Sequence, residues 1–199
     1  MARRRVDVRR DEILAATIEQ VEQRGLARTR VSDVAAALGI SSGLVFYHFA
    51  TKDALLVAAF ERAVAKDLVR LDKAAQTGTD TTDRLRRVLA VFGPTGSAPG
   101  WRIWIDAWAL ALREPQIRTA LRRLDERWNR SLLDVVTAGV ADGTFRCPDP
   151  DGSVARLSAL IDGLSVATLA YRNVSRTQLR TWVREAAARE VGVDPEVLG

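Results

Sequence analysis

Residues 31–56 read VSDVAAALGISSGLVFYHFATKDALL. Apolar residues recur in this stretch every three to four positions, which is the spacing of one face of an α-helix. The pattern breaks at Gly39, Ile40 and Ser41, where glycine permits a sharp turn and serine is a preferred residue at a helix start. The stretch therefore predicts two short helices joined by a tight turn, which is the form of a helix-turn-helix.

The apolar positions indicate which side chains face outward. Val34 and Leu38 hold the first short helix to a core, and Val45 and Phe49, four residues apart, hold the second to the same core. The opposite face of the second helix is then exposed and has the size and form to enter a DNA major groove. This outward face consists of Ser42, Gly43, Leu44, Tyr47 and His48.

Residues 31–56 resemble the DNA-binding signature of the TetR family of bacterial transcriptional regulators. The matching elements are Val34-Ala35, the turn Gly39-Ile40-Ser41, Gly43, the triplet Tyr47-His48-Phe49, and Lys52 ahead of two leucines. The resemblance implies that Ser42, Gly43, Leu44 and Tyr47 lie at base edges or groove walls. It also implies that Tyr47, His48 and Lys52 bind phosphates and set the register on the duplex.

Two positions depart from the family pattern. Leu44 stands where a small hydroxyl residue is common, so it loses a hydrogen bond but can pack on a thymine methyl. Arg30 stands where a serine or threonine often caps the first short helix, and it can add a phosphate contact instead. The departures leave the operator sequence open.

Less specific interpretations of His48 and Lys52 also exist. A single histidine is commonly structural or solvated, and Lys52 can be a solvated residue at a helix start. A cation in the first helical turn is unfavourable without an anionic partner, which favours a phosphate near Lys52. The position of His48 within the signature favours the DNA-binding interpretation.

The rest of the chain has the same helical periodicity and almost no strand-like alternation. Besides the two short helices, helices are expected at 9–24, 52–75, 82–92, 101–113, 115–141, 153–172 and 176–190. The sequence thus predicts an all-α protein of about nine helices, in which an N-terminal three-helix helix-turn-helix domain precedes a C-terminal bundle. The expected parts are a DNA-binding domain at 1–52, a connector helix at 53–75, and a ligand-binding and dimerisation domain at 76–199.

Two segments are expected to lie outside this helical framework. Residues 1–10 contain five arginines and one aspartate, and they form either a solvated tail or a basic arm along DNA. The DNA-binding motif downstream favours the arm. Residues 93–100 contain three glycines and two prolines and are expected to form a mobile loop.

Composition narrows the possible functions. The net charge of +5 favours nucleic acid as a partner without demonstrating it. Cys147 is the only cysteine and His48 the only histidine, which excludes an intrachain disulfide, a His/Cys metal site and a second histidine for a catalytic triad. The sequence therefore predicts no enzyme activity, cofactor or metal. It also lacks a signal peptide and any unbroken apolar run near the length of a membrane span, so a cytoplasmic protein is expected.

A tryptophan stripe marks the expected helix at 101–113. Trp101, Trp104 and Trp108 share one face, which can be ordinary core packing or the aromatic wall of a ligand pocket. Asp106 interrupts the same helix, and a carboxylate near indoles suits an organic cation through cation–π contacts. Asp162 and Tyr171, in the apolar helix at 153–172, are further candidate ligand anchors.

Residues 80–170 are similar, more weakly, to the regulatory domain of choline-sensing, BetI-type repressors of the TetR family. The similarity is carried by residues 104–113 together with Leu124, Trp128, Leu132, Gly139 and Gly143-Thr144-Phe145. It implies the architecture of the domain, and it does not identify choline as the ligand.

The helices at 153–172 and 176–190 are the expected dimer seam. The first is apolar on nearly all sides and contains the small residues Gly163, Ser165 and Ala167, which permit close helix approach. Pairing with the same helices of a second copy, through residues 153–190, makes a four-helix interface.

These features together predict a homodimeric repressor that binds double-stranded DNA at a palindromic operator and is released by a small molecule. In this mechanism the helix at 52–75 transmits the effector signal to the recognition helices. The alternative is a TetR-like regulator without a small-molecule inducer, controlled by a protein partner. An enzyme within a helical bundle lacks paired catalytic groups, and a purely structural dimerisation module leaves the signature at 31–56 unexplained.

Overall fold

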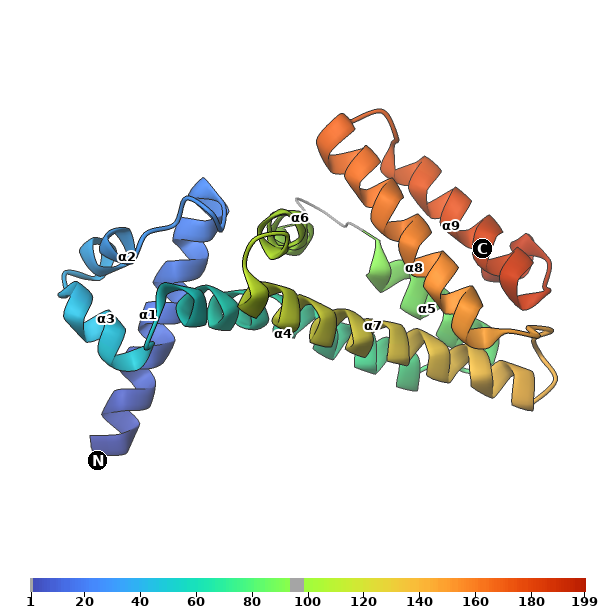
Figure 1. The fold of residues 1–199 in the computed structure, drawn as a ribbon. Helices are drawn as coiled ribbons and strands as arrows, with labels where there is room; N and C mark the ends of the chain where they lie inside the picture. The colour runs from blue at the N-terminus through green and yellow to red at the C-terminus, as the bar shows by residue number, and fades with distance from the viewer. Residues whose placement is uncertain (1, 94–98) are drawn as a thin grey trace. The chain divides into compact units, whose positions relative to one another are not determined.

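The computed structural model describes residues 2–93 and 99–199, and within them the chain forms nine α-helices and no strand (Figure 1). The helices are α1 (Ala2–Arg24), α2 (Val31–Leu38), α3 (Ser42–His48), α4 (Lys52–Gln76), α5 (Thr81–Phe92), α6 (Pro99–Ala111), α7 (Pro115–Ala141), α8 (Pro150–Val166) and α9 (Arg176–Val191). A π-helical turn, Ala167–Tyr171, continues α8, and a 3-10 turn, Pro195–Leu198, follows α9. The all-α prediction is confirmed.

The chain forms two compact units. The first contains the residues up to Lys66 together with Pro99–Leu124, and the second contains the remaining described residues. Helix α6 packs with the N-terminal helices in the first unit. The expected functional boundaries at 52 and 75 remain a prediction. Both α4 and α7 begin in the first unit and continue into the second.

The core of the first unit is built by α1 to α4. One polar side chain in α1, Thr17, is fully buried and donates a hydrogen bond to the Ile13 carbonyl oxygen at 2.7 Å, so it leaves no unpaired polar group. The buried apolar residues of this core are Ile13, Leu14, Ala16, Val34, Ala35, Val45, Phe49, Leu55 and Ala59.

Helix α1 is longer than the sequence predicted. It begins at Ala2 rather than near residue 9, so the basic N-terminal segment is part of this helix. The segment contains no glycine or proline before Gly25, and alanine and arginine favour helix. An Arg9–Glu12 ion pair of 2.7 Å also supports the helix between positions i and i+3.

The second unit packs α5, most of α7, α8 and α9 around a separate core. Leu85, Val88, Leu132, Leu157 and Ile161 are almost completely buried in it. Arg156 of α8 also donates two hydrogen bonds to the carboxylate of Glu190 of α9, at 2.6 and 2.9 Å. This contact lowers the pKa of Glu190 to about 2.

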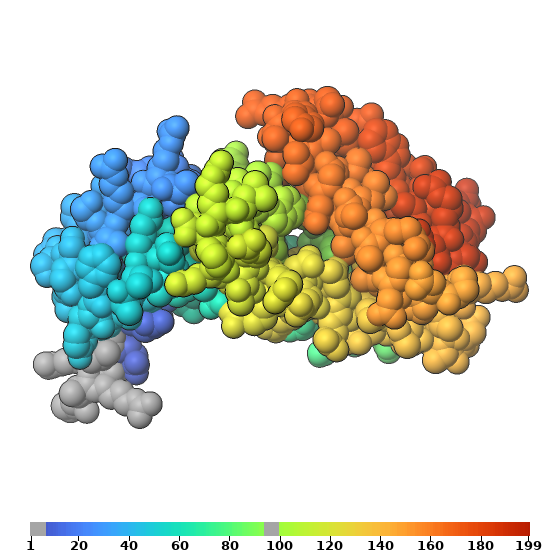
Figure 2. All heavy atoms as spheres, viewed as in Figure 1, coloured from blue at the N-terminus to red at the C-terminus, as the bar shows by residue number. Residues whose placement is uncertain are grey.

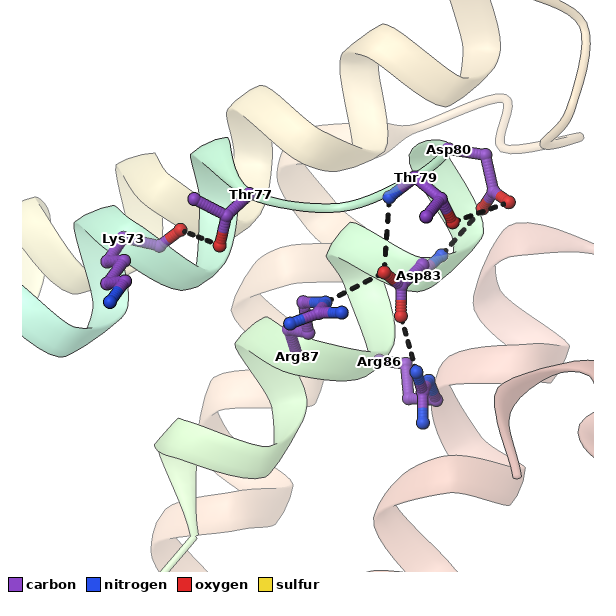
Figure 3. A network of polar contacts seen from close by, with 7 residues as sticks. All are labelled: Lys73, Thr77, Thr79, Asp80, Asp83, Arg86 and Arg87. Atoms are coloured by element: carbon purple, nitrogen blue, oxygen red, sulfur yellow. Dashed lines mark hydrogen bonds and ion pairs between the residues drawn. The ribbon is translucent and has the colours of Figure 1, made fainter.

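A polar network fixes the start of α5 (Figure 3). Asp80 caps the helix by accepting a hydrogen bond from the Asp83 backbone N–H at 2.8 Å. The side chain of Asp83 in turn accepts from Arg86, from Arg87 and from the Thr79 N–H, and these contacts lower its pKa to about 2.

One expectation about hydropathy is corrected. Within the described ranges, one helix, Pro150–Tyr171, is long and apolar enough to cross a membrane by length and composition, with a mean hydropathy of 1.3. Small residues and the charged Arg156 and Asp162 interrupt its apolar positions, so the sequence contains no unbroken apolar run of that length. A core helix of a soluble protein meets the same criterion, so the evidence for a membrane span is weak. Most of the expected loop at 93–100, residues 94–98, lies outside the described residues.

Candidate functional site

The turn between α2 and α3 has the geometry of a helix-turn-helix. Gly39 ends α2 with a φ of +63°, in the left-handed region, and the Ile40 N–H donates to the Ala35 carbonyl at 3.0 Å. An added β-carbon on Gly39 would meet nothing within 4 Å. Glycine is therefore favoured here by the backbone conformation and not by lack of space.

Helix α3 has one buried and one exposed face. Ser41 caps it by accepting a hydrogen bond from the Leu44 N–H at 3.2 Å. Val45 and Phe49 are 1% and 3% exposed, whereas Tyr47 is 74% exposed. The predicted orientation of the helix is confirmed. The other outward candidates are exposed or half-buried: Ser42, Gly43, Leu44 and His48.

Arg10 contacts the end of α3. Its Nη1 donates to the His48 carbonyl oxygen at 2.8 Å, and its guanidinium lies 4.2 Å from the centre of the Phe49 ring. The two contacts join α1 to the end of the exposed helix through a hydrogen bond and a cation–π contact. Sequence reasoning placed this arginine in an arm along DNA, and nothing in the sequence indicated a contact 38 residues away.

A basic hollow of about 770 Å³ lies beside Lys52 at the start of α4. Its lining residues are Gln23, Arg24, Ala27, Arg28, Arg30, Asp33 and Lys52. The hollow thus has four cationic side chains and one carboxylate, and that carboxylate already pairs with Arg24 at 3.2 Å. The remaining positive charge suits phosphate groups of a nucleic acid backbone.

Sequence reasoning selected Arg30 and Lys52 for this surface and missed Arg24 and Arg28. The sequence feature that indicates Arg24 and Arg28 is a cluster of three arginines within residues 24–30, directly ahead of α2. Helices α2 and α3, in blue to cyan, lie at the surface of the first unit (Figure 2).

The tryptophan stripe of α6 is a contiguous aromatic cluster. The rings of Trp101 and Trp108 are 6.0 Å apart in an edge-to-face arrangement, and those of Trp104 and Trp108 are 6.4 Å apart. Trp104 also meets Phe60 of α4 edge-to-face at 5.2 Å. All three indoles are half-buried, so each retains accessible surface in this chain.

Asp106 binds the backbone of the turn after α1. Its Oδ2 accepts a hydrogen bond from the Leu26 N–H at 3.2 Å. Leu26 follows Gly25, which ends α1 with a φ of +81°, and an added β-carbon on Gly25 would lie 2.9 Å from the same carboxylate oxygen. Helix α6 and the turn after α1 are therefore in close contact.

Asp162 lies within the second unit, where it interacts with Asp125 of α7. Burial, together with the nearby Asp125 charge, raises the pKa of Asp162 to about 7. The pKa of Asp125 is also raised, by burial and by Glu126. A hydrogen bond of 3.1 Å from the Asn129 amide to Asp125 is its only one among the described residues.

Several polar atoms near these carboxylates in sequence are buried without a hydrogen-bond partner among the described residues. They are Trp128 Nε1 of α7, Ser165 Oγ of α8 and Thr168 Oγ1 of the π-helical turn. Tyr171, at the end of that turn, is 73% exposed. The candidate ligand residues thus fall into two groups, one on α6 in the first unit and one on α8 and its π-turn in the second.

Two parts of the chain match known protein families. Residues 13–59 match the bacterial regulatory proteins of the tetR family, and residues 81–192 match the C-terminal domain of BetI-type transcriptional repressors. The chain belongs to the TetR family.

Individual relatives of this TetR-family chain agree with the assignment. The HTH-type transcriptional regulator BetI of Paraburkholderia xenovorans is 33% identical over 164 residues, which cover 79% of this chain and 80% of the relative. BetI of Burkholderia cenocepacia is 32% identical over 162 residues, with the same coverage. A solved structure of a transcriptional regulator from Saccharomonospora viridis in complex with choline is 30% identical, with a TM-score of 0.80 over 90% of this chain and 95% of that one.

This TetR-family protein is thus a BetI-like transcriptional regulator and not an enzyme. Regulators of the family bind DNA, are typically dimeric, and typically respond to a small-molecule effector. In the ranges that the structure describes, no group of three or more His, Cys, Asp or Glu side chains is placed to hold a metal ion.

Proposed function

We propose that the chain is a dimeric repressor that binds a palindromic operator and leaves it when a small organic cation binds. The exposure of Tyr47 on α3, opposite the buried Val45 and Phe49, carries the DNA-binding part of the proposal. A helix anchored in this way can enter a major groove without unfolding its own core.

The proposed roles follow the position of each residue around α3. Ser42, Gly43, Leu44 and Tyr47 contact bases or groove walls, and the exposed Gly43 allows close approach of the backbone. The phosphate contacts come from Tyr47, His48 and the cations of the basic hollow, Arg24, Arg28, Arg30 and Lys52.

Dimerisation is proposed through residues 153–190, which contain most of α8, the π-turn and α9. Ala155, Ala159 and Gly163, spaced by four on α8, are all exposed in the single chain. A stripe of small residues lets two helices approach closely, and an added β-carbon on Gly163 would meet nothing within 4 Å. A two-fold dimer of this kind places two recognition helices on a palindromic site.

The effector is proposed to be an organic cation. The similar protein from Saccharomonospora viridis was solved in complex with choline. In this chain, Asp125 and Asp162 bring two carboxylates together in a partly buried environment, where a cation lowers the cost of ionising both. Within the first unit, the indoles of Trp101, Trp104 and Trp108 are separate candidates for cation–π contacts, with Asp106 as a polar anchor. Within the second unit, Trp128 and Tyr171 are candidates.

The release step is proposed to use helix α4, which begins beside the recognition helix and continues into the second unit. An effector that binds one arrangement of α4 more tightly than the other stabilises that arrangement, in which the recognition helices no longer match the operator. The size of the population shift is set by the difference between the two affinities. A regulator controlled only by a protein partner is the alternative, and the comparisons do not favour it. Since the protein acts on DNA in a bacterial cell, we propose a cytoplasmic location.

The experiment that tests this function selects bound sites from random duplex DNA and titrates salt on the enriched site. A palindrome whose affinity falls steeply with salt is expected, and Tyr47→Ala should abolish selective binding. Val69→Ala, at an exposed apolar residue of α4 outside the DNA-binding helices, is the control and should bind as the parent does. Enrichment of no sequence at moderate salt would contradict the proposal.

A further inference from the structure

A second basic hollow lies between α5 and α9, within the second unit, and it shares no lining residue with the hollow beside Lys52. It has a volume of about 320 Å³. Three arginines line it, Arg86 from α5 and Arg180 and Arg184 from α9, together with the hydroxyl residues Thr177 and Thr181. The lining contains no aspartate or glutamate.

Arg184 lacks a compensating partner. It is half-buried, its Nε is inaccessible to solvent, and no hydrogen bond or ion pair satisfies its guanidinium among the described residues. A guanidinium offers five donors, and leaving a buried donor unpaired is costly. The position therefore favours an anion that is not part of this chain.

The other two arginines differ from each other in their pairing. Arg86 is held by Asp83, a carboxylate that it shares with Arg87. Arg180 makes only a long contact of 3.4 Å to the Thr177 hydroxyl, and it is exposed. Arg180 and Arg184, four residues apart on one helix face, thus offer to the same hollow two guanidinium groups that have no ion-pair partner among the described residues.

Most of the remaining lining consists of apolar side chains. Leu179, Val183 and Leu198 are buried side chains that line the hollow, together with Leu89 and Ala90 of α5. Gly93 and Gly199 line it through their backbone. Apolar surface of this kind binds aliphatic groups, whereas a fully hydrated ion such as inorganic phosphate gains nothing from it.

We propose that this hollow binds a small organic carboxylate with an aliphatic body. Arginine pairs with a carboxylate through two parallel hydrogen bonds, and the leucine and valine side chains take the hydrocarbon. The volume of about 320 Å³ lies at the small end of ligand pockets, which fits an alkanoate of medium length. The site goes beyond the proposed function because it takes the opposite charge to the cationic effector and involves none of the residues proposed to bind that effector. Its α9 residues also belong to the segment proposed for dimerisation.

Calorimetric titration of the full-length protein with octanoate tests the site. Octanol, octylammonium and inorganic phosphate at matched ionic strength are the comparison ligands. Octanoate should bind, and the three comparison ligands should bind at least tenfold more weakly. If octanol binds as tightly as octanoate, the hollow binds the hydrocarbon without the carboxylate. If phosphate binds as tightly, the hollow is an unselective anion site. Either result would overturn the proposal.

Variants assign the binding to the arginines. Arg184→Gln should lower octanoate affinity about tenfold, the value of one charge-assisted hydrogen bond. Arg180→Gln should lower it several-fold, and its exposed position keeps folding intact if Arg184→Gln does not fold. Arg130→Gln, exposed on α7 and outside both the lining and the segment proposed for dimerisation, is the matched control and should bind octanoate unchanged. Unchanged affinity in Arg180→Gln would contradict the site. Because the test requires neither DNA nor a cationic effector, its failure leaves the repressor proposal untouched.

Discussion

Asp106 Oδ2 and the Leu26 backbone N–H form a 3.2 Å hydrogen bond that joins α6 to the turn after α1, across 80 residues of sequence. The aspartate is half-buried in a tryptophan-rich helix, and its acceptor serves a residue that is itself fully buried. The sequence suggested a ligand-binding role for Asp106. Through this hydrogen bond, Asp106 also holds the turn after α1, next to the DNA-binding helices, against α6.

Substitution of Asp106 separates these two roles. Asp106→Leu removes the acceptor and leaves the Leu26 N–H unpaired, so we expect the free energy of unfolding to fall by about 1–3 kcal/mol. Asp106→Asn keeps an acceptor oxygen and should remain close to the parent in stability and in DNA affinity. Chemical denaturation and operator titration of both variants measure this. If Asp106→Asn retains stability but loses affinity for an organic cation, the charge of Asp106 contacts the effector.

The small-residue stripe on α8 predicts the effect of a bulky substitution on assembly. Gly163→Leu fills the space that a second copy is proposed to occupy, so we expect a monomer at micromolar concentration with unchanged helix content. Light scattering and circular dichroism measure these two quantities. Thr137→Leu, at an exposed position on α7, is the matched control and should leave the dimer intact. A dimeric Gly163→Leu would place the seam elsewhere.

The local features of the DNA-binding helices could be predicted because they depend on local physics. Gly39, Ser41 and the spacing of Val45 and Phe49 are turn, cap and periodicity signals, and the structure has each of them in the expected place. The start of α1 was predicted too late, since a basic helix without apolar periodicity resembles a solvated tail.

The contacts that join distant segments could not be predicted. The hydrogen bonds between Arg10 and His48 and between Asp106 and Leu26 connect residues that are 38 and 80 positions apart. Rules based on residue spacing within a helix or turn do not predict pairs this far apart. The pairing of Asp125 with Asp162 likewise depends on how α7 and α8 pack. The sequence indicated only that Asp162, in an apolar helix, needs a partner or a ligand.

The raised pKa of Asp162 predicts a pH dependence of stability. The ordinary pKa of an aspartate is 3.8, and the pKa of Asp162 in the fold is about 7. At a pH between these two values, the folded chain therefore keeps a proton that the unfolded chain has lost. The contribution of Asp162 to stability is therefore fully present below the lower value and is lost as the pH rises through 7. Between pH 5 and 7.5 we expect the Tm to fall by a few degrees, roughly.

Asp162→Asn should reduce this decrease, because the amide does not titrate. Asp125, whose pKa is also raised, should leave a smaller residual slope. Affinity for an organic cation should increase over the same pH range in the parent and not in Asp162→Asn. A parent Tm that is flat from pH 5 to 7.5 would show that Asp162 is not protonated in the fold.

The basic hollow beside Lys52 predicts how individual cations contribute to DNA binding. Arg28 is exposed, lines the hollow and has no ion-pair partner among the described residues, so Arg28→Ala should leave stability unchanged. If Arg28 binds a phosphate, the slope of log affinity against log salt should decrease by about one for each monomer that loses the contact. The loss should be similar for operator and for unrelated duplex DNA, because a phosphate contact carries no sequence information. Arg62→Ala, on α4 outside the lining of the hollow, is the control and should keep the parental slope. A change restricted to one operator sequence would instead assign Arg28 to base recognition.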